Sequence, residues 1–405
     1  MSTPRTHPLW HCVRHCFIRR NVVRLIAVVA LIPSAALACL WDHDTLRQER
    51  SKFPEVLELI TGKFLRHSPE FYEWRIKDRT EKLKTDPTNL AYHDDLAVAY
   101  SKVGRTKDAI AMMEAKEKLK PGLYETYSNL GTFYILAGEF EKGLPYIDKA
   151  LAINPDAHFG REKYQKWVVE YALTRKANDG SLKFPLYDWD QPKSVTFLQF
   201  INKKIEAKTG RPGNADDAKA AITGVLGMMR FANYDNPLLL EALAHVLRYQ
   251  QGDGSADRLA ARALLQASYR MTDATAREKY RQLAQEALSL QKGVRDLSQP
   301  SPNTEDDFKA ELADAGRWYD DLRAKEIAWI QNGSDVEAEF DRLYTEAPRV
   351  ADVEKSDPRT FANRIRRISW PRTLGLALGI VGLVGTIFVA ARRRSAQHTA
   401  TSGGV

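Results

Sequence analysis

A repeat of 34 residues in the first half of the chain constrains the fold more than any other feature. When the sequence is shifted by 34 positions, residues of similar size and chemistry align. The aligned pairs are Leu96/Leu130, Ala97/Gly131, Tyr100/Tyr134, Gly104/Gly138, Ala109/Gly143, Met113/Ile147, Lys116/Ala150 and Pro121/Pro155. A fixed period of about 20–50 residues indicates stacked units of one supersecondary structure. We therefore expect a repeat array over residues 87–157.

The spacing within each unit predicts two helices joined by a tight turn. Leu96, Ala97 and Tyr100 would share one face of the first helix. Gly104 suits the turn because glycine has no Cβ to oppose a positive φ angle. A small residue such as Gly143 would let the second helix approach the first closely. The aligned prolines would end the second helix of each unit, because proline cannot continue a helix.

These positions resemble the tetratricopeptide repeat (TPR), a helix–turn–helix unit of about 34 residues. Lys116 departs from the pattern, since the family has a small residue there. The resemblance implies an all-α fold, a TPR-like α-solenoid of helical hairpins, whose concave face binds protein or peptide segments. The family register places the following residues on that face: Ala91, Asp94, Asp95, Val98, Ser101 and Lys102 in the first repeat, and Glu125, Ser128, Asn129, Thr132, Ile135 and Leu136 in the second.

Some members of this family clamp a partner's C-terminal carboxylate with lysine and asparagine side chains. Here Asp94 and Ser128 stand at the lysine positions, and Val98 and Thr132 stand at the asparagine positions. Aspartate would repel a carboxylate, so the resemblance implies a ligand of mixed polar and apolar character instead.

Residues 1–38 have the pattern of a secretory signal peptide. They contain five arginines and no acidic residue, and an apolar run at residues 25–32 precedes Ala36-Leu37-Ala38. A basic head, an apolar middle of about 7–15 residues and a small-residue exit direct export. The apolar run is too short to span a bilayer, which needs about 20 residues.

Residues 373–391 are predicted to form a transmembrane helix. They carry no charge and are bracketed by Arg372 and the arginine triplet at residues 392–394. Arginines flank both ends, so their count does not set the orientation. The signal peptide does, because export places the middle of the chain outside. We expect a single-pass protein of the inner (cytoplasmic) membrane, with its bulk periplasmic or extracytoplasmic and residues 392–405 in the cytoplasm.

Two features near the membrane each allow two interpretations. Cys39 follows the small-x-small site and resembles the acylated cysteine of bacterial lipoproteins, although Ala36 stands where leucine is usual. A diacylglycerol anchor at Cys39 and ordinary cleavage beside an incidental cysteine are both open. Gly375 and Gly379 form a GxxxG motif that permits close helix–helix contact and dimerisation, but glycine is frequent in membrane helices in any case.

The net charge of +8 does not indicate nucleic-acid binding. Twelve of the 60 basic residues lie before Cys39 or from Arg364 onward, and between them acidic residues exceed basic ones by about four. A basic surface that would bind nucleic acid is therefore not expected on the exported part.

The flanks of the repeat are predicted to be helical. We expect an N-terminal helical cap at 39–86, degenerate TPR-like hairpins at 158–295, and helices followed by a polar stalk at 296–364. Helical spacing covers residues 53–84, 160–173, 216–231, 237–250, 256–271, 274–290, 305–331 and 335–345. A less regular stretch with turn and proline signals lies at 175–192.

The sequence contains no phosphate-binding loop, nucleophile elbow or HExxH motif. Asp42, His43 and Asp44 could hold a metal, but we favour an exposed capping segment, and we predict no metal, cofactor or catalytic residue. The chain is thus predicted to be a membrane-tethered scaffold for protein–protein interaction. The alternative is an envelope enzyme, or a subunit of one, with a site in residues 175–231, where Asp188 and Asp190 lie among aromatic residues. A strongly perturbed carboxylate in a deep pocket would favour that alternative.

Overall fold

The computed structural model describes residues 40–45, 53–155, 160–177, 180–188, 190–191, 194–249, 254–289 and 304–345. The described chain is all-helical, as expected, and its only β-type feature is an isolated antiparallel bridge between Lys176 and Leu182. The helices are α3 Val56–Thr61, α4 Pro69–Thr85, α5 Leu90–Lys102, α6 Thr106–Leu119, α7 Tyr124–Leu136, α8 Phe140–Ile153, α9 Arg161–Leu173, α10 Phe197–Thr209, α11 Ala215–Phe231, α12 Pro237–Leu247, α13 Gly254–Arg270, α14 Ala274–Ser289, α15 Thr304–Gln331 and α16 Val336–Thr345.

The repeated sequence folds into two helical hairpins, α5–α6 and α7–α8. Gly104 and Gly138 occupy the turns at φ 81° and 78°, a conformation that glycine adopts without steric cost. Helices α7 and α8 cross closely, because a Cβ added at Gly143 would lie 2.8 Å from the carbonyl oxygen of Gly131. Helices α6 and α8 end just before the aligned prolines. The expected turns, crossing and helix ends are all present.

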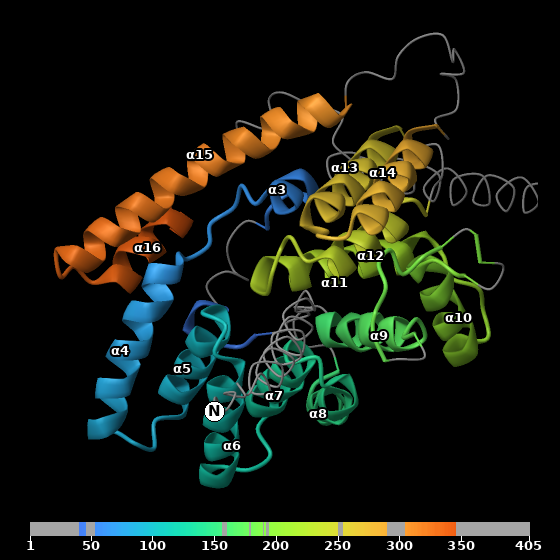
Figure 1. Ribbon diagram of the computed structural model, residues 1–405. Coiled ribbons are helices and arrows are strands. Elements are labelled where there is room, and N and C mark those ends of the chain that lie inside the picture. Colours follow the sequence, from blue (N-terminus) through green and yellow to red (C-terminus); the bar gives the residue numbers. More distant parts are fainter. Residues whose placement is uncertain are drawn as a thin grey trace, which may run out of the picture.

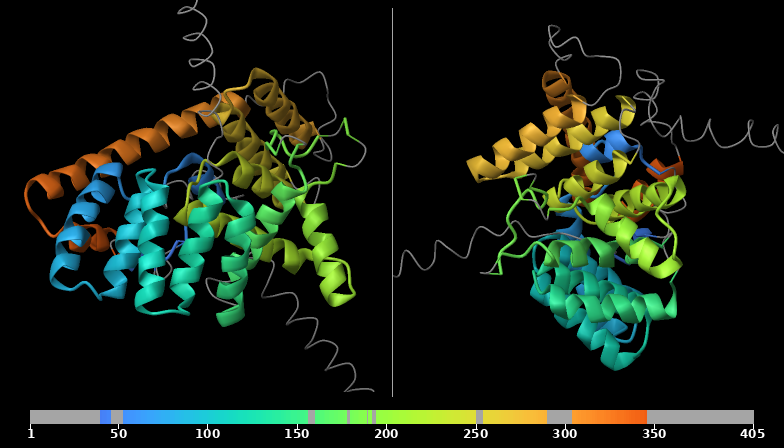
Figure 2. Two further views of the ribbon diagram at one scale, coloured as in Figure 1. Left: turned by 60° about the horizontal axis from the view of Figure 1, so that its bottom comes forward. Right: turned by 90° about the vertical axis from the view of Figure 1, so that its right-hand side faces the viewer.

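Helices α4 to α9 stand side by side in chain order, and each contacts the next (Figure 1). The left view of Figure 2 shows this row, with α15 (orange) running along its top. Helix α15 contacts α13 and α3 and also reaches α4 and α16, so it brings the end of the described chain back to its beginning.

Helix α12 lies at the centre of the second half, and all of its residues are buried. It contacts α11, α13 and α10, and its leucines join a core that extends from Val56 of α3 to Phe308 of α15. Each fully buried leucine side chain contributes roughly 1.5–3 kcal/mol relative to an exposed one. The main core therefore lies around α12, and the α5–α6 hairpin contributes to a smaller, separate cluster.

Two parts of the helix prediction were wrong. The stretch 53–84 contains two helices, because Gly62 ends α3 in the left-handed conformation (φ 81°) and Ser68 begins α4 as its N-cap. Helix α10 was not predicted. It begins with a capping box of Thr196 and Gln199, a recognised helix start.

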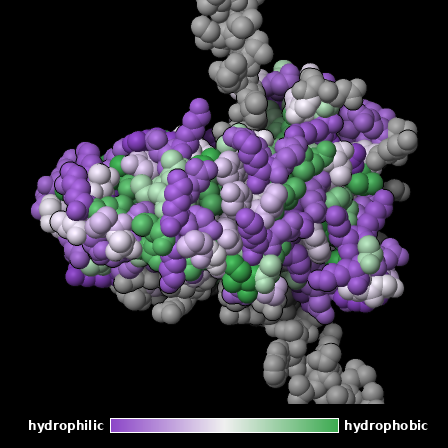
Figure 3. Space-filling view, turned by 90° about the horizontal axis from the view of Figure 1, so that it is seen from below, coloured by the Kyte–Doolittle hydropathy of each residue, from purple (hydrophilic) through white to green (hydrophobic). Residues whose placement is uncertain are grey.

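The predicted signal peptide, Cys39, the stalk, Gly375, Gly379 and the helix at 373–391 lie outside the described residues. Among the helices that are described, none is both long and apolar enough to cross a membrane. Figure 3 shows the face seen from below in Figure 1, where hydrophilic residues predominate and hydrophobic ones form separate small groups. Scattered apolar side chains are normal on a protein surface.

Candidate functional site

Residues 40–42 lead into the start of a helix at residues 43–45, and this segment is held by its own side chains. The Asp42 carboxylate accepts hydrogen bonds from the backbone N–H groups of Asp44 (3.2 Å) and Thr45 (3.1 Å), as an N-cap residue does. The Thr45 hydroxyl in turn accepts from the backbone N–H of Asp42 (3.1 Å). The local sequence therefore sets the shape of this segment.

This segment lies against the inner face of the repeat, by which we mean the side of α5 and α7 that carries Asp95, Val98 and Asn129. The Asn129 side chain binds the main chain of Trp41 at both polar groups: Oδ1 accepts from the Trp41 N–H (2.8 Å) and Nδ2 donates to the Trp41 carbonyl oxygen (3.0 Å). The Asp95 carboxylate accepts from the backbone N–H of His43 (2.9 Å). The main chain of residues 41 and 43 is thus bound independently of its side chains.

Apolar contacts add to this main-chain binding. Leu40 is 3% exposed and joins the cluster that contains Val98 and Leu130. The Trp41 ring meets Tyr124 edge to face, with centroids 6.1 Å apart, a favoured aromatic geometry. We expected residues 39–46 to be exposed, and for residues 40–45 that expectation is wrong: only the His43 side chain is exposed.

The acidic side chains of the segment bind a buried arginine of α4. Arg75 is fully buried and donates to Asp44 through both terminal nitrogens (2.7 and 3.2 Å), and to Asp42 (3.3 Å). It also donates to Glu337 of α16 (2.7 Å). Arg79, one turn further on, joins Asp95 (2.8 Å) to the same Glu337 (2.5 Å). Arginine suits this role because its planar fork binds carboxylates at two points.

His67 links the segment to α15. Its Nε2 lies 3.2 Å from Asp44 and its Nδ1 lies 2.6 Å from Glu326. Glu326 also accepts from the backbone N–H of Ser68 (2.7 Å), at the start of α4. The imidazole is stacked on Phe71, with ring centroids 3.6 Å apart. The segment 40–45, α4 and α15 therefore meet at one buried imidazole.

The charges in this cluster shift each other's pKa values. Burial alone would raise the pKa of Asp44, but Arg75 and His67 together hold it well below its usual range. Burial and the neighbouring Asp44 charge raise the pKa of Asp42 to about 6. Burial would lower the pKa of His67, but Asp44 and Glu326 outweigh it and raise the value to about 9. At neutral pH the imidazole is therefore charged.

The predicted groove residues are mostly buried. Asp94 is buried and forms an ion pair with Lys116 (2.5 Å), so its carboxylate does not line an open groove. Burial raises the pKa of Asp94 to about 7 although Lys116 lowers it. The same contact explains how a lysine is accepted where the repeat has a small residue. Thr132 accepts from Gln165 of α9 (3.0 Å). Val98, Ser128 and Ile135 are also buried, whereas Ser101, Glu125 and Leu136 are half-buried and Ala91 is exposed.

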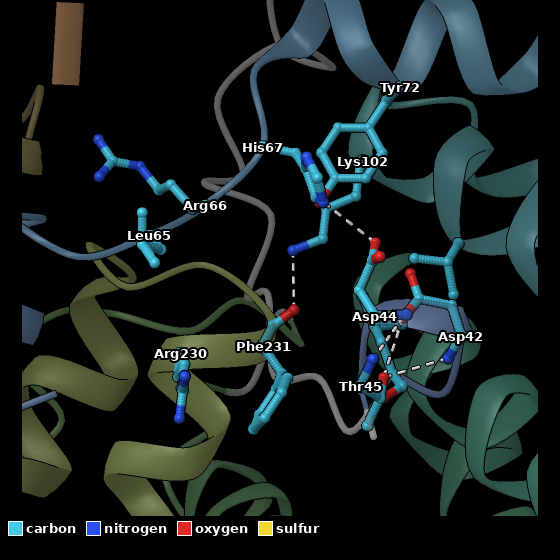
Figure 4. A pocket seen from close by; sticks show the side chains of 12 residues that line it. Asp42, Asp44, Thr45, Leu65, Arg66, His67, Tyr72, Lys102, Arg230 and Phe231 are labelled. Atoms are coloured by element: carbon cyan, nitrogen blue, oxygen red, sulfur yellow. Dashed lines mark hydrogen bonds and ion pairs between the residues drawn. The ribbon is translucent and has the colours of Figure 1, made fainter. Parts of the chain in front are cut away.

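Lys102, which was also predicted to line the groove, caps the end of α11. Its Nζ donates to the carbonyl oxygens of Phe231 (2.7 Å) and Ala232 (2.8 Å), and burial lowers its pKa to about 8. Figure 4 shows Lys102 reaching across a small hollow toward Phe231, with Asp42 and Asp44 on the opposite side from Arg66. The hollow holds about 390 Å³ of space free of protein atoms, part of it open solvent. It belongs to the packing between the segment and α11.

The region of the alternative enzymatic site contains a second buried carboxylate, Glu241 of α12. It accepts from the backbone N–H groups of Leu186 (2.9 Å) and Tyr187 (2.8 Å) and from the Tyr280 hydroxyl (2.7 Å). Burial raises its pKa to about 7. Asp188 lies at the surface of this loop and binds Lys279 (3.0 Å), and Asp190 is exposed. Glu241 thus fixes a loop, and three donors surround its oxygens.

Sequence reasoning missed Asn129 as a main-chain ligand, and it missed Arg75, His67, Glu326 and Glu337. The partners of His67 and Arg75 include residues more than 250 positions away. The one local signal was the Asp-His-Asp sequence at 42–44, whose carboxylates need a cation if they are buried. Among the described residues, no group of acidic, histidine and cysteine side chains is arranged to hold a metal ion.

No protein-family model matches this chain, and no curated protein matches it.

Proposed function

We propose that this chain is a membrane-tethered scaffold of TPR type that binds a protein or peptide segment on the inner face of α5 and α7. The 34-residue period and the matching hairpins, with a glycine at positive φ in each turn, support the repeat assignment. The proposal includes a signal peptide at 1–38, a membrane helix at 373–391 and a periplasmic or extracytoplasmic repeat domain.

One observation carries the binding function. Asn129 binds the main chain of Trp41 at both its N–H and its carbonyl group. Main-chain hydrogen bonds of this kind supply affinity in peptide recognition, while pockets for side chains supply specificity. This intramolecular contact supports a peptide-binding role for the inner face.

Glu241 is the group that would favour the enzymatic alternative, because its pKa is raised to about 7. Its surroundings argue for a structural role instead. It is fully buried, and its oxygens accept from two backbone N–H groups and one tyrosine hydroxyl. A general base needs access to the proton that it abstracts. We therefore propose binding as the function.

The proposal is tested by photocrosslinking from the inner face in intact membranes. A photoreactive residue would replace Ser101 or Glu125, which are half-buried groove positions of α5 and α7, and Lys142, 67% exposed on α8, would be the control position. We expect a discrete protein adduct from Ser101 and Glu125 that is absent at Lys142 and is lost when Asn129→Ala is added. The same adducts at all three positions, or adducts unaffected by Asn129→Ala, would contradict the proposal.

A further inference from the structure

Residues 40–45 occupy the inner face as a bound peptide would. Their main chain is held by side chains of α5 and α7, namely Asp95 and Asn129. These hydrogen bonds recognise backbone groups, and a separate peptide could make them equally well. The segment contributes only two large apolar side chains, Leu40 and Trp41, and Trp41 is only partly buried. Its attachment therefore depends chiefly on hydrogen bonds and ion pairs.

Four side chains of the segment contact the surrounding helices, and one, His43, does not. Leu40 enters an apolar cluster, Trp41 packs on Tyr124, and Asp42 and Asp44 both bind Arg75. The side chain of His43 is exposed, and only its backbone N–H is bound. The surface thus selects an ordered pattern: apolar, aromatic, acidic, any residue, acidic.

The two acidic positions are the most demanding part of this pattern. Arg75 is fully buried, and without the segment Glu337 would be its remaining ion partner among the described residues. His67 would keep only Glu326. A buried cation that loses its partner is strongly destabilising. Any occupant that replaces residues 40–45 must therefore bring carboxylates to the same two places.

We propose that residues 40–45 are an intramolecular stand-in for the peptide that this surface binds, and that the partner presents an apolar–aromatic–acidic–x–acidic segment. The inference rests on the proposed function and names its ligand class. A tethered segment has a high effective concentration, on the order of millimolar for a short flexible connection. The partner peptide therefore binds when the intramolecular segment is weakened or drawn away.

The test uses the full-length chain in detergent or nanodiscs and a labelled peptide with the sequence of residues 40–45, acetylated at its N-terminus. The chain would carry Trp41→Ala and Asp44→Asn, which weaken its own segment and leave the surface unchanged. We expect this variant to bind the peptide in fluorescence anisotropy, and the parent chain to bind it at least about tenfold more weakly. A peptide with asparagine at both acidic positions should lose about tenfold or more in affinity, since about 1.4 kcal/mol corresponds to tenfold and bonds to charged groups exceed that.

A variant that also carries Asn129→Ala should lose the peptide, because the main-chain contact is gone. No binding by the weakened chain while its circular dichroism matches the parent would overturn the inference, and the photocrosslinking test of the proposed function would still stand. Equal affinity for the aspartate and asparagine peptides would overturn it too. If the weakened chain forms dimers that do not bind the peptide, the inference is overturned, because the inner face then binds a second copy of this chain.

A second design covers the case in which the weakened chain does not fold. A protease site is placed between residues 46 and 52, which leaves the contact residues named above intact, and cleavage after folding releases the covalent link. Mass spectrometry then follows exchange of the cleaved segment for the labelled peptide. Exchange that is competed by the acidic peptide but not by its asparagine counterpart supports the inference. Retention of the cleaved segment against a large excess of peptide would overturn it.

Discussion

Two short segments are docked onto the helices named above, and they differ mainly in which partner supplies the buried carboxylates. Residues 40–45 bring their own carboxylates, Asp42 and Asp44, to a buried arginine. In the loop that contains Leu186 and Tyr187 the carboxylate belongs to the scaffold: Glu241 of α12 accepts from the loop's backbone N–H groups. At the first site a buried cation binds the acidic side chains of the docked segment, whereas at the second a buried carboxylate binds the backbone of the loop.

At the first site the docked segment must itself be acidic, whereas at the second the helix supplies the buried carboxylate. A backbone contact tolerates many sequences, whereas a buried guanidinium accepts only a segment with acidic residues at set positions. The electrostatics agree with this. The pKa of Asp44 is held well below its usual range by Arg75 and His67, although burial opposes this, while burial raises the pKa of Glu241 to about 7.

Two of the buried histidines, His67 and His245, have pKa values that are shifted in opposite directions. Asp44 and Glu326 outweigh burial and raise the pKa of His67 to about 9. Burial first, and then the charges of Arg248 and Arg175, lower the pKa of His245 to about 3. His245 is therefore neutral, and its Nδ1 accepts the first N–H of α10, from Phe197 (3.1 Å).

The largest effect is expected when the site that binds Asp42 and Asp44 loses its cation, Arg75. Arg75→Met leaves Asp42 and Asp44 buried without their main partner, which should cost about 3–5 kcal/mol of unfolding free energy. Urea unfolding measures this. Lys84→Met on the same helix is the control, because Lys84 is 65% exposed. A loss for Arg75→Met as small as that of the control would show that the two carboxylates rehydrate without cost.

A smaller effect is expected at Glu241, which binds backbone N–H groups of the loop. Glu241→Gln keeps one acceptor oxygen but points an amide at donors from Leu186, Tyr187 or Tyr280, so it should cost about 1–3 kcal/mol. Glu278→Gln, on the exposed side of α14, is the matched control. Should Glu241→Gln prove as damaging as Arg75→Met, the distinction between the two sites would not hold.

The histidines should respond to pH in opposite directions. For His67, whose folded pKa is raised, stability is fully present below about pH 6.5 and is lost as pH rises through 9. For His245, whose folded pKa is lowered, stability is present above about pH 6.5 and is lost as pH falls toward 3. Each group can contribute a slope of at most about 1.4 kcal/mol per pH unit.

Unfolding free energies of the parent, His67→Gln and His245→Gln at a series of pH values measure these slopes. The difference between parent and His67→Gln should shrink from pH 6.5 to 9, and the difference for His245→Gln should shrink from pH 6.5 to 4. Slopes of the same sign would contradict the assigned surroundings.

The smallest effect is expected at the surface of the loop. Lys279 and Asp188 form an ion pair at 3.0 Å, with side chains 33% and 21% exposed. Such pairs contribute about 0–1 kcal/mol because water and salt screen them. Lys279→Met should therefore change the unfolding free energy by less than about 1 kcal/mol, with any change disappearing at high salt. A larger loss would mean that Asp188 helps to fix the loop that Glu241 holds.

Local sequence determined the repeat hairpins and most helix boundaries. Gly104 and Gly138 predicted the turns, and the helices at 160–173, 216–231 and 274–290 agree with the structure to within one residue at each end. These features depend on residues a few positions apart, so a single sequence shows them. The capping box that begins α10 was also present in the sequence but was not used.

Only the tertiary structure decided what covers the inner face. The register identified Asp94, Asn129 and Lys102 as facing residues, but not that Lys116, the Trp41 main chain and the end of α11 bind them. Arginine is seldom fully buried, so no sequence pattern pointed to Arg75. The contacts of Arg75 with Glu337 and of His67 with Glu326 join residues about 260 positions apart. Periodicity describes neighbours along the chain, whereas these ion pairs form only because α15 carries the chain back to α4.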